Sequence, residues 1–590
     1  MRGFLRQARV LVPCSTWVLA LCLLGFAALS AIAAGQALEA ARRDVLRGDQ
    51  LNLAVMSAKL ADPELFPRDH TFGRVELFAY YTPSFLRLTA LATGITRDPA
   101  IAWAILLGPL LFVYLTGMFL ALCVPARNWL VAAALAVLSA RPHISAPLEV
   151  WGLADLDYVL PRSFALACVP WILFVALVGL QRAGDDRGAW WPVLVGFFIG
   201  AITNLHPGTG LHAAVLGFPL LALHLFRSRR GVVRLVLAGV ALLAGAAPML
   251  LTYLGGTGGI GGGVEGSWQE FTEVVVTRLR GYVHPFTGLS VDEGTLTRLT
   301  DLFLATQAAI VGLAAVGALT SRVPKLGGRL LHARWAISLV PLTAVAIAPG
   351  EAHPLLWTWV AFAIAVPLVG RPTRLDWTIL ALLALTLAHV FAVTPWLQDQ
   401  WYERELPALT SFAVEHPRLS RFVYLPLYLA AARLSGVLVP LLSRRILRAL
   451  LPAGVAVACA WPLSGLRARL EPHKALPMDP AAVQLYAWAR AQTSKDALFF
   501  FPDLAFRYYA RRSITHAWKD LSAAIYTRGR LHAEWTRFSR YEHARRDPTT
   551  LVELARAERI DYIVRYRDEA TLPLPVAYEN WGYLVYRVAR

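Results

Sequence analysis

The polar and apolar positions of this chain follow two different patterns. Long apolar runs alternate with short polar segments over residues 1–463, whereas charged positions are frequent and no long apolar run occurs over residues 464–590. A helix of about 20 apolar residues crosses the ~30 Å hydrocarbon core of a bilayer. The first pattern therefore predicts a mainly α-helical, polytopic membrane protein with about thirteen spans. The runs lie near residues 10–34, 99–124, 128–145, 162–180, 189–204, 209–226, 231–254, 301–320, 333–349, 354–370, 375–395, 421–442 and 446–463.

One apolar segment does not fit a span. Residues 75–97 are interrupted by Glu76, Pro83 and Arg87, and this mixture favours a helix that lies in the membrane interface. If this segment were counted as a span, every later loop would change sides.

Loop charges test this topology independently. The formal net charge is +18, and Lys and Arg concentrate in cytoplasmic loops. With a cytoplasmic N-terminus, indicated by Arg2, Arg6 and Arg9, an odd number of spans places each arginine-rich loop inside. Those loops cover residues 227–234, 322–334, 371–374 and 444–448. Residues 36–98, 141–161, 255–300, 396–420 and 464–590 then lie outside.

Composition narrows the class of protein further. The chain is 57% hydrophobic and only 16% charged, with a mean hydropathy of +0.50, which excludes an ordinary soluble multidomain protein. No RNA-binding signature accompanies the positive charge. We therefore expect membrane lipids, and not nucleic acid, as its partners. The sequence leaves the oligomeric state open.

The C-terminal segment, residues 464–590, predicts a small α/β domain outside the membrane, after a transmembrane domain of residues 1–463 with a first outer loop of residues 36–98. Asp479 and Pro480 suit the N-cap and first position of a helix. Helices are expected over residues 479–491, 521–545 and 549–557, strands over 498–501 and 561–566, and a closing hairpin over 576–578 and 583–588.

The first outer loop carries the densest group of acids. Asp62, Glu64 and Asp69 lie between two prolines or beside them, and the prolines stiffen the turn. Grouped carboxylates can hold a divalent cation such as Mg²⁺ or Mn²⁺, or one of them can act as a general base. A solvated loop whose acids cap the next helix fits the same pattern equally well.

Three further positions suit a phosphate group. The turn Asn204-Leu-His-Pro-Gly208 sets His206 beside residues that allow close approach of a ligand, although an interhelical turn capped by Asn204 explains it too. In residues 141–162, Arg162 and His143 could bind a lipid-linked phosphate, or local salt bridges could account for them. Arg433 lies within an apolar run and could reach a lipid phosphate, unless it pairs with a helix-end carbonyl or extends to the interface.

These motifs resemble the GT-C superfamily of polyprenol-phosphate-sugar-dependent glycosyltransferases. The resemblance covers the whole architecture but rests on short motifs: Asp62-Pro-Glu64, Phe66-Pro-Arg-Asp69 and Asn204-Leu-His-Pro-Gly208. The tail is similar to a C-terminal domain of unknown function found on bacterial GT-C-like proteins, through Phe506-Arg507, Arg511, Arg512, Trp518-Lys519 and Tyr583-Leu-Val-Tyr586. The sequence departs from the family in having no adjacent acidic pair.

The resemblance implies a multi-pass glycosyltransferase of a bacterial inner membrane that moves a sugar from a polyprenyl-phosphate donor to an acceptor at the periplasmic face. Asp69 would take the acceptor proton, with Asp62 and Glu64 supporting it or holding a cation. Arg162 and His206 would neutralise the departing lipid phosphate. Two alternatives remain: a lipid-linked glycan transporter or flippase, which predicts an internal repeat that is not evident, and a non-catalytic envelope scaffold, whose outer loops would not converge.

Overall fold

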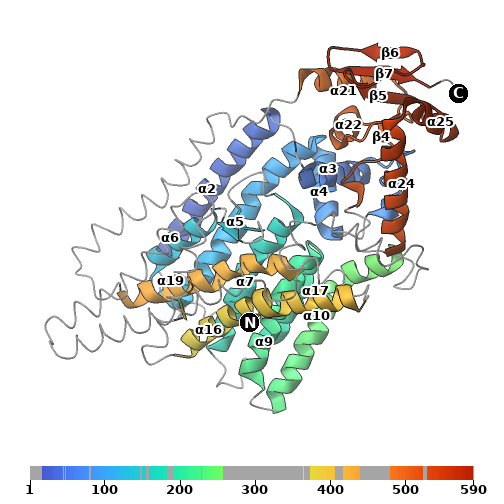
Figure 1. Cartoon of the computed structure of the whole chain (residues 1–590). Coiled ribbons are helices and arrows are strands. Elements are labelled where there is room, and N and C mark those ends of the chain that lie inside the picture. The colour runs from blue at the N-terminus through green and yellow to red at the C-terminus, as the bar shows by residue number, and fades with distance from the viewer. Residues whose placement is uncertain are drawn as a thin grey trace.

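The computed structural model describes residues 16–43, 46, 48–78, 82–141, 143–145, 149–153, 159–181, 190–226, 229–256, 360, 363–364, 373–404, 416–438, 479–521 and 528–588. Within these residues the chain is mostly helical, with a small sheet domain at its C-terminal end (Figure 1).

The helical region is that of a membrane protein. In the part of the chain that the structure describes, five helices are long and apolar enough to cross a bilayer: α2 (Thr16–Arg43), α5 (Pro99–Ala126), α7 (Pro161–Leu180), α9 (Pro207–Leu225) and α10 (Arg229–Gly256). Shorter apolar helices accompany them: α6 (Trp129–Ser139), α8 (Trp191–Thr203), α16 (Arg374–Ala388) and α19 (Tyr424–Leu438). A π-helical turn, η4 (His389–Val393), continues α16 into α17 (Thr394–Glu403).

Several predicted segments end differently from their apolar runs. The run at 128–145 gives α6, which stops at Ser139, and a short hairpin follows: β1 (His143–Ser145) and β2 (Glu149–Trp151). The segment at 75–97 gives a 3-10 turn, η1 (Val75–Leu77), and a 14-residue helix, α4 (Pro83–Thr96). The runs at 301–320, 333–349 and 446–463, and most of 354–370, lie outside the described residues, so the span count stays a prediction.

Glycines let α8 and α10 pack with their backbones in contact. A Cβ atom built on Gly196 would lie 2.1 Å from the carbonyl oxygen of Ala238, and one on Gly200 would lie 2.1 Å from that of Leu242. Any side chain there would force the helices apart. Close packing through small residues is a common way for helices to associate in membranes, where the lipid tails are as apolar as the side chains.

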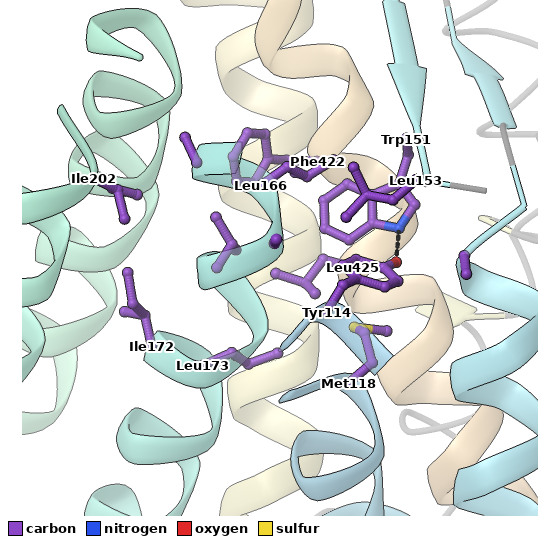
Figure 2. Close-up of a cluster of buried hydrophobic side chains, with 14 of the residues drawn as sticks. Tyr114, Met118, Trp151, Leu153, Leu166, Ile172, Leu173, Ile202, Phe422 and Leu425 are labelled. Atoms are coloured by element: carbon purple, nitrogen blue, oxygen red, sulfur yellow. Dashed lines mark hydrogen bonds between the residues drawn. The ribbon is translucent and has the colours of Figure 1, made fainter. Parts of the chain in front are cut away.

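A buried cluster at the junction of the β1–β2 hairpin, α5 and α7 supports the site described below (Figure 2). Trp151 donates its indole N–H to the hydroxyl oxygen of Tyr114 at 2.8 Å and packs edge-on against Phe422. Phe422 belongs to a 3-10 segment, η6 (His416–Val423), that leads directly into α19. The hairpin and the helices thus hold η6 in place through apolar contact.

The C-terminal domain is a three-layer α/β structure. Its five strands run in the order β4-β3-β5-β7-β6, with β3 (Leu498–Phe500) parallel to β4 (Ser513–Ile514) and β5 (Tyr562–Tyr566). The last strands, β6 (Val576–Glu579) and β7 (Tyr583–Arg587), form the predicted hairpin and run antiparallel.

Alternate residues of the strands face two helical layers. One face packs on α21 (Pro480–Gln492) and α22 (Leu504–Ala510), and the other packs on α24 (Arg528–Arg546) and α25 (Pro548–Ala557). Asp479 caps α21, and Pro480 is its first residue, as predicted. The predicted helix at 521–545 corresponds to α24, which begins at Arg528. The sequence pattern predicted neither α22 nor β4.

The C-terminal domain packs against the polar segment that follows α2. This segment, here called the first loop, contains α3 (Gly48–Ala61) and α4, and α3 contacts α22 (Figure 1). The main chain N–H of Arg68 donates to the Ser513 hydroxyl, and its guanidinium forms an ion pair with Asp561 at 2.5 Å. Residues nearly five hundred positions apart therefore share one interface.

Candidate functional site

The first turn of α9 fixes the tautomer of the His206 ring. His206 is the N-cap of α9, and its Nδ1 accepts the main-chain N–H of Thr209 at 3.0 Å. Because Nδ1 accepts this bond, the neutral ring carries its proton on Nε2. Burial, followed by the charges of Arg421, Arg418 and Arg162, holds the pKa of His206 well below its ordinary value of 6.5. His206 is therefore a neutral side chain with an N–H donor at Nε2.

Two arginines come from η6. A 3-10 helix has three residues per turn, so Arg418 and Arg421 lie on the same side of it. Arg421 is fully buried, and its Nη2 donates to the hydroxyl oxygen of Thr209 at 2.7 Å. Phe422 packs edge-on against His212 of α9, which keeps η6 against that helix. Arg421 is therefore fixed beside the first turn of α9.

A third arginine comes from the start of α7. Arg162 is the second residue of that helix and is half-buried. Its charge lowers the pKa of both His206 and Asp49. We call Arg162, His206, Arg418 and Arg421 the cationic cluster. The structure thus brings together Arg162 and His206, which the sequence predicts as phosphate-binding residues, and adds the two arginines of η6.

An acid that the sequence analysis did not single out lies at the edge of this cluster. Asp49 is in the first turn of α3, and its side chain is 55% exposed. Partial loss of contact with water would by itself raise the pKa of Asp49. The positive charges of Lys519, Arg162 and Arg418 outweigh this effect and lower the pKa below its ordinary value. Asp49 is therefore an ionised carboxylate at neutral pH, within the electrostatic reach of the cationic cluster.

Asn204 and His143 flank the cluster in different ways. The amide of Asn204 donates to the carbonyl of Gly245 at 2.8 Å and accepts from the N–H of Met249 at 2.7 Å. These groups are four residues apart in α10, so the side chain ties the end of α8 to that helix. His143 opens β1, opposite Trp151 in the hairpin that contacts η6. Asn204 thus has a structural task, and His143 lies on a strand beside the cluster.

Asp69, the predicted base, lies in a separate cluster with Arg507 and Asp520. Arg507 donates to Asp69 at 2.8 Å and 3.3 Å, and to Asp520 at 2.8 Å and 3.0 Å. The three side chains are 1%, 0% and 6% exposed in the order Asp69, Arg507 and Asp520. We call these residues the docking cluster because they join the first loop to the C-terminal domain.

The carboxylate of Asp69 also accepts three main-chain N–H groups. Its Oδ1 accepts from Thr71 and Phe72 at 3.0 Å and 2.9 Å, and its Oδ2 accepts from Ile514 at 3.3 Å. Burial raises the pKa of Asp69, and the charge of Arg507 opposes that shift. Both oxygens are therefore already occupied by donors from two parts of the chain.

The other predicted acids do not join Asp69. Asp62 and Glu64 are exposed, and Asp62 accepts the main-chain N–H of Glu64 at 3.2 Å. Among the residues that the structure describes, no group of three or more His, Cys, Asp or Glu side chains is placed to hold a metal ion. The arrangement of Asp62, Glu64 and Asp69 does not fit a shared cation site.

Arg433 has a counter-ion within the helical region. Its Nε lies 2.8 Å from Oδ1 of Asp376, and this carboxylate also accepts from Thr373 in a capping box at the start of α16. Arg433 therefore pairs with a carboxylate of another helix, and not with the helix-end carbonyl that the sequence suggested as an alternative. Binding of a lipid phosphate at Arg433 stays a prediction and would require this pair to rearrange.

The residues that the sequence analysis missed left weak signals. Asp49 is an acid soon after the first apolar run, and Arg418 and Arg421 are three positions apart before the run at 421–442. Neither pattern is distinctive without the fold. Arg507 and Lys519 were noted in the tail, but their partners in the first loop lie 438 and 470 positions away.

Comparison with known proteins finds solved structures of low similarity to this chain. No family model and no curated protein sequence matches the chain. Among solved structures, it is similar to the archaeal oligosaccharyltransferase AglB from Archaeoglobus fulgidus in complex with an inhibitory peptide and a dolichol-phosphate. The TM-score is 0.45 at 13% identity, covering 93% of this chain and 69% of that one.

A second similar structure is the Archaeoglobus fulgidus oligosaccharyltransferase in complex with Zn and sulfate. The TM-score is 0.41 at 11% identity, covering 91% of this chain and 68% of that one. Both neighbours are archaeal oligosaccharyltransferases. A likeness of this size assigns no substrate and no residue role to this chain.

Proposed function

We propose that this chain is a membrane glycosyltransferase that moves a sugar from a polyprenyl-phosphate donor to an acceptor. The observation that carries this proposal is the convergence of three separate segments: Arg162 and His206 lie at the starts of the apolar helices α7 and α9, and Arg421 of η6 donates to the hydroxyl of Thr209 in the first turn of α9. Such helix ends carry partial positive charge. A phosphate on a long prenyl chain suits this place because its tail can lie among the helices while its charge meets the arginines.

The cationic cluster suits a phosphate leaving group. When the bond between C1 of the sugar and the phosphate oxygen breaks, the electron pair goes to that oxygen. Fixed positive groups around the departing phosphate stabilise the charge without having to reorganise. The arginines supply this charge, and the neutral His206 supplies an N–H donor from Nε2.

Asp49 is the acid best placed to receive the acceptor proton. The acceptor hydroxyl oxygen forms the new bond to C1, and its proton passes to a carboxylate that must be ionised and accessible. Asp49 is 55% exposed and has a lowered pKa. We therefore propose Asp49 as the general base beside the cationic cluster.

The acids predicted from the sequence take other roles in this proposal. Asp69 would have to release Arg507 and three main-chain N–H groups before it could accept a proton or bind a cation. We propose that its task is to hold the C-terminal domain. Asp62 and Glu64 remain exposed candidates for contacting the acceptor.

We place this chemistry on the outer face of the membrane. The positive-inside rule puts the N-terminus and the arginine-rich loops inside, so the first loop and residues 464–590 lie outside. With the bacterial origin that the sequence motifs imply, this would be the periplasmic face of the inner membrane.

Binding of a polyprenyl phosphate tests the proposal. We would reconstitute the full chain in phosphatidylcholine nanodiscs and measure the binding of radiolabelled undecaprenyl phosphate. Arg162→Met should weaken this binding about tenfold or more, because a charge-assisted hydrogen bond contributes about 1.5–3 kcal/mol. Arg556→Met is the matched control, since Arg556 is exposed on α25.

The same preparation separates the alternative functions. If neither Arg162→Met nor His206→Asn changes binding, the cationic cluster is not the phosphate site and the proposal is wrong. Transfer of a fluorescent polyprenyl-phosphate analogue across vesicles containing the chain would instead favour a flippase. Absence of binding altogether would favour the scaffold.

A further inference from the structure

Lys519 connects the C-terminal domain with the edge of the cationic cluster. Its Nζ lies 2.5 Å from Oδ1 of Asp49, and its side chain is 28% exposed. Asp49 is also within the electrostatic reach of Arg162 and Arg418. One carboxylate therefore lies between a cation of the C-terminal domain and the cations proposed to bind the lipid phosphate.

The main chain around Lys519 is held from two sides. The next residue, Asp520, accepts two hydrogen bonds from Arg507, which also binds Asp69 of the first loop. The carbonyl of Lys519 accepts from Nδ2 of Asn52 at 3.5 Å. The docking cluster therefore fixes where the Lys519 side chain begins, while its flexible four-carbon stem leaves the ammonium free to change partner.

A phosphate in the cationic cluster would compete with Asp49 for this ammonium. It carries the same sign of charge as Asp49, so it repels the carboxylate and attracts Lys519. The Lys519–Asp49 pair is partly exposed, and such pairs are weak. A phosphate held by several arginines offers Lys519 a stronger partner.

We propose that Lys519 is a substrate-binding residue that leaves Asp49 and binds the phosphate of the polyprenyl donor when it arrives. The exchange adds a cation to the phosphate site and frees the Asp49 carboxylate to accept the acceptor proton. It also makes the C-terminal domain a part of the site. This inference rests on the proposed function and adds a residue to it.

Two substitutions test the exchange because they should act in opposite directions. The measurement is the binding of radiolabelled undecaprenyl phosphate to the full chain in phosphatidylcholine nanodiscs. Lys519→Met should weaken binding about tenfold, the effect of losing one charge-assisted hydrogen bond. Asp49→Asn should tighten it about two- to fivefold, because it removes both the competitor for Lys519 and a nearby negative charge.

The double variant and a matched control complete the test. In Lys519→Met/Asp49→Asn, the tightening by Asp49→Asn should be smaller than in the single variant, since there is no lysine left to release. Lys495→Met removes the same charge from an exposed position of the C-terminal domain and should leave binding unchanged. Lys519→Arg should retain most of the binding.

The outcomes separate this inference from the proposed function. If Arg162→Met weakens binding while Lys519→Met has no effect, the exchange is wrong and the cationic cluster stands as the phosphate site. If Lys519→Met and Asp49→Asn weaken binding equally, the pair is only a structural tie, and the exchange is again overturned. Displacement of the lipid by inorganic phosphate at equal concentration would assign the site to a free phosphate and overturn the lipid part.

Discussion

The docking cluster joins the C-terminal domain to the first loop, whereas the cationic cluster lies at the starts of α7 and α9 and in η6, and the two use charge in opposite ways. In the docking cluster, one guanidinium lies between two carboxylates, and Asp69 and Asp520 have their oxygens filled by donors from this chain. In the cationic cluster, burial and then the positive charges of Arg421, Arg418 and Arg162 hold the pKa of His206 well below its ordinary value. The acid at its edge, Asp49, is more than half exposed.

This difference distinguishes charges that stabilise the domain interface from charges that we propose bind a ligand. A buried ion pair whose hydrogen bonds are complete gains nothing from a ligand, and breaking it is costly. The arginines of the cationic cluster lie around a neutral histidine, and their positive charge would attract an anion. Substitutions in the docking cluster should therefore change the stability of the domain interface, whereas those in the cationic cluster should change ligand binding alone.

The largest effect is expected for Arg507→Met. This change leaves two buried carboxylates without their cation, which costs about 3–5 kcal/mol when one partner of a buried pair is removed. Main-chain amides of residues 66–72 and 506–514 should lose most of their protection in hydrogen exchange. Arg490→Met, at an exposed position of α21, is the control. Unchanged protection in Arg507→Met would show that the domain docks by its other contacts.

A smaller effect on the same interface is expected for Asp69→Asn. In Asn, an N–H₂ group replaces one carboxylate oxygen and faces the N–H donors that now bind that oxygen. The interface should therefore lose about 2 kcal/mol of stability. We expect lower exchange protection at residues 506–514 and, with it, weaker transfer.

A base role for Asp69, as predicted from the sequence, would give a different result. Transfer would then be abolished while membrane insertion and exchange protection stayed at the level of the unchanged chain. Glu76→Gln, at an exposed position of the same loop that the proposal gives no role, should change neither quantity by comparable amounts.

Sequence patterns predicted local structure better than they predicted the site. Asp479 and Pro480 predicted the start of α21, and residues 75–97, which Glu76, Pro83 and Arg87 interrupt, form only a 3-10 turn and a 14-residue helix. These signals act within a few residues. They depend on no other part of the chain.

The site depended on pairings that no local signal carries. The acids of the first loop suggested chemistry, but Asp69 pairs with Arg507, 438 positions later, and so serves docking in the structure. His206 and Arg162 could be predicted as candidates because a turn and a helix start are visible locally, and their role in binding a phosphate stays a prediction. Arg421 was not predicted, because its role depends on η6 packing against α9.

The smallest effect is expected for His206→Asn, and it should appear in binding only. Asn is one of the residues preferred at the N-cap, so α9 should keep its first turn. The free energy of unfolding should change by less than about 0.5 kcal/mol. The ring donor at Nε2 is lost, and undecaprenyl phosphate should bind about fivefold more weakly, since a hydrogen bond to a charged group is removed. Binding to nanodisc-reconstituted protein and hydrogen exchange at residues 506–514 are measured on the same sample. A loss of exchange protection there would mean that the two clusters are one structural unit, and that the separation of docking from ligand binding does not hold.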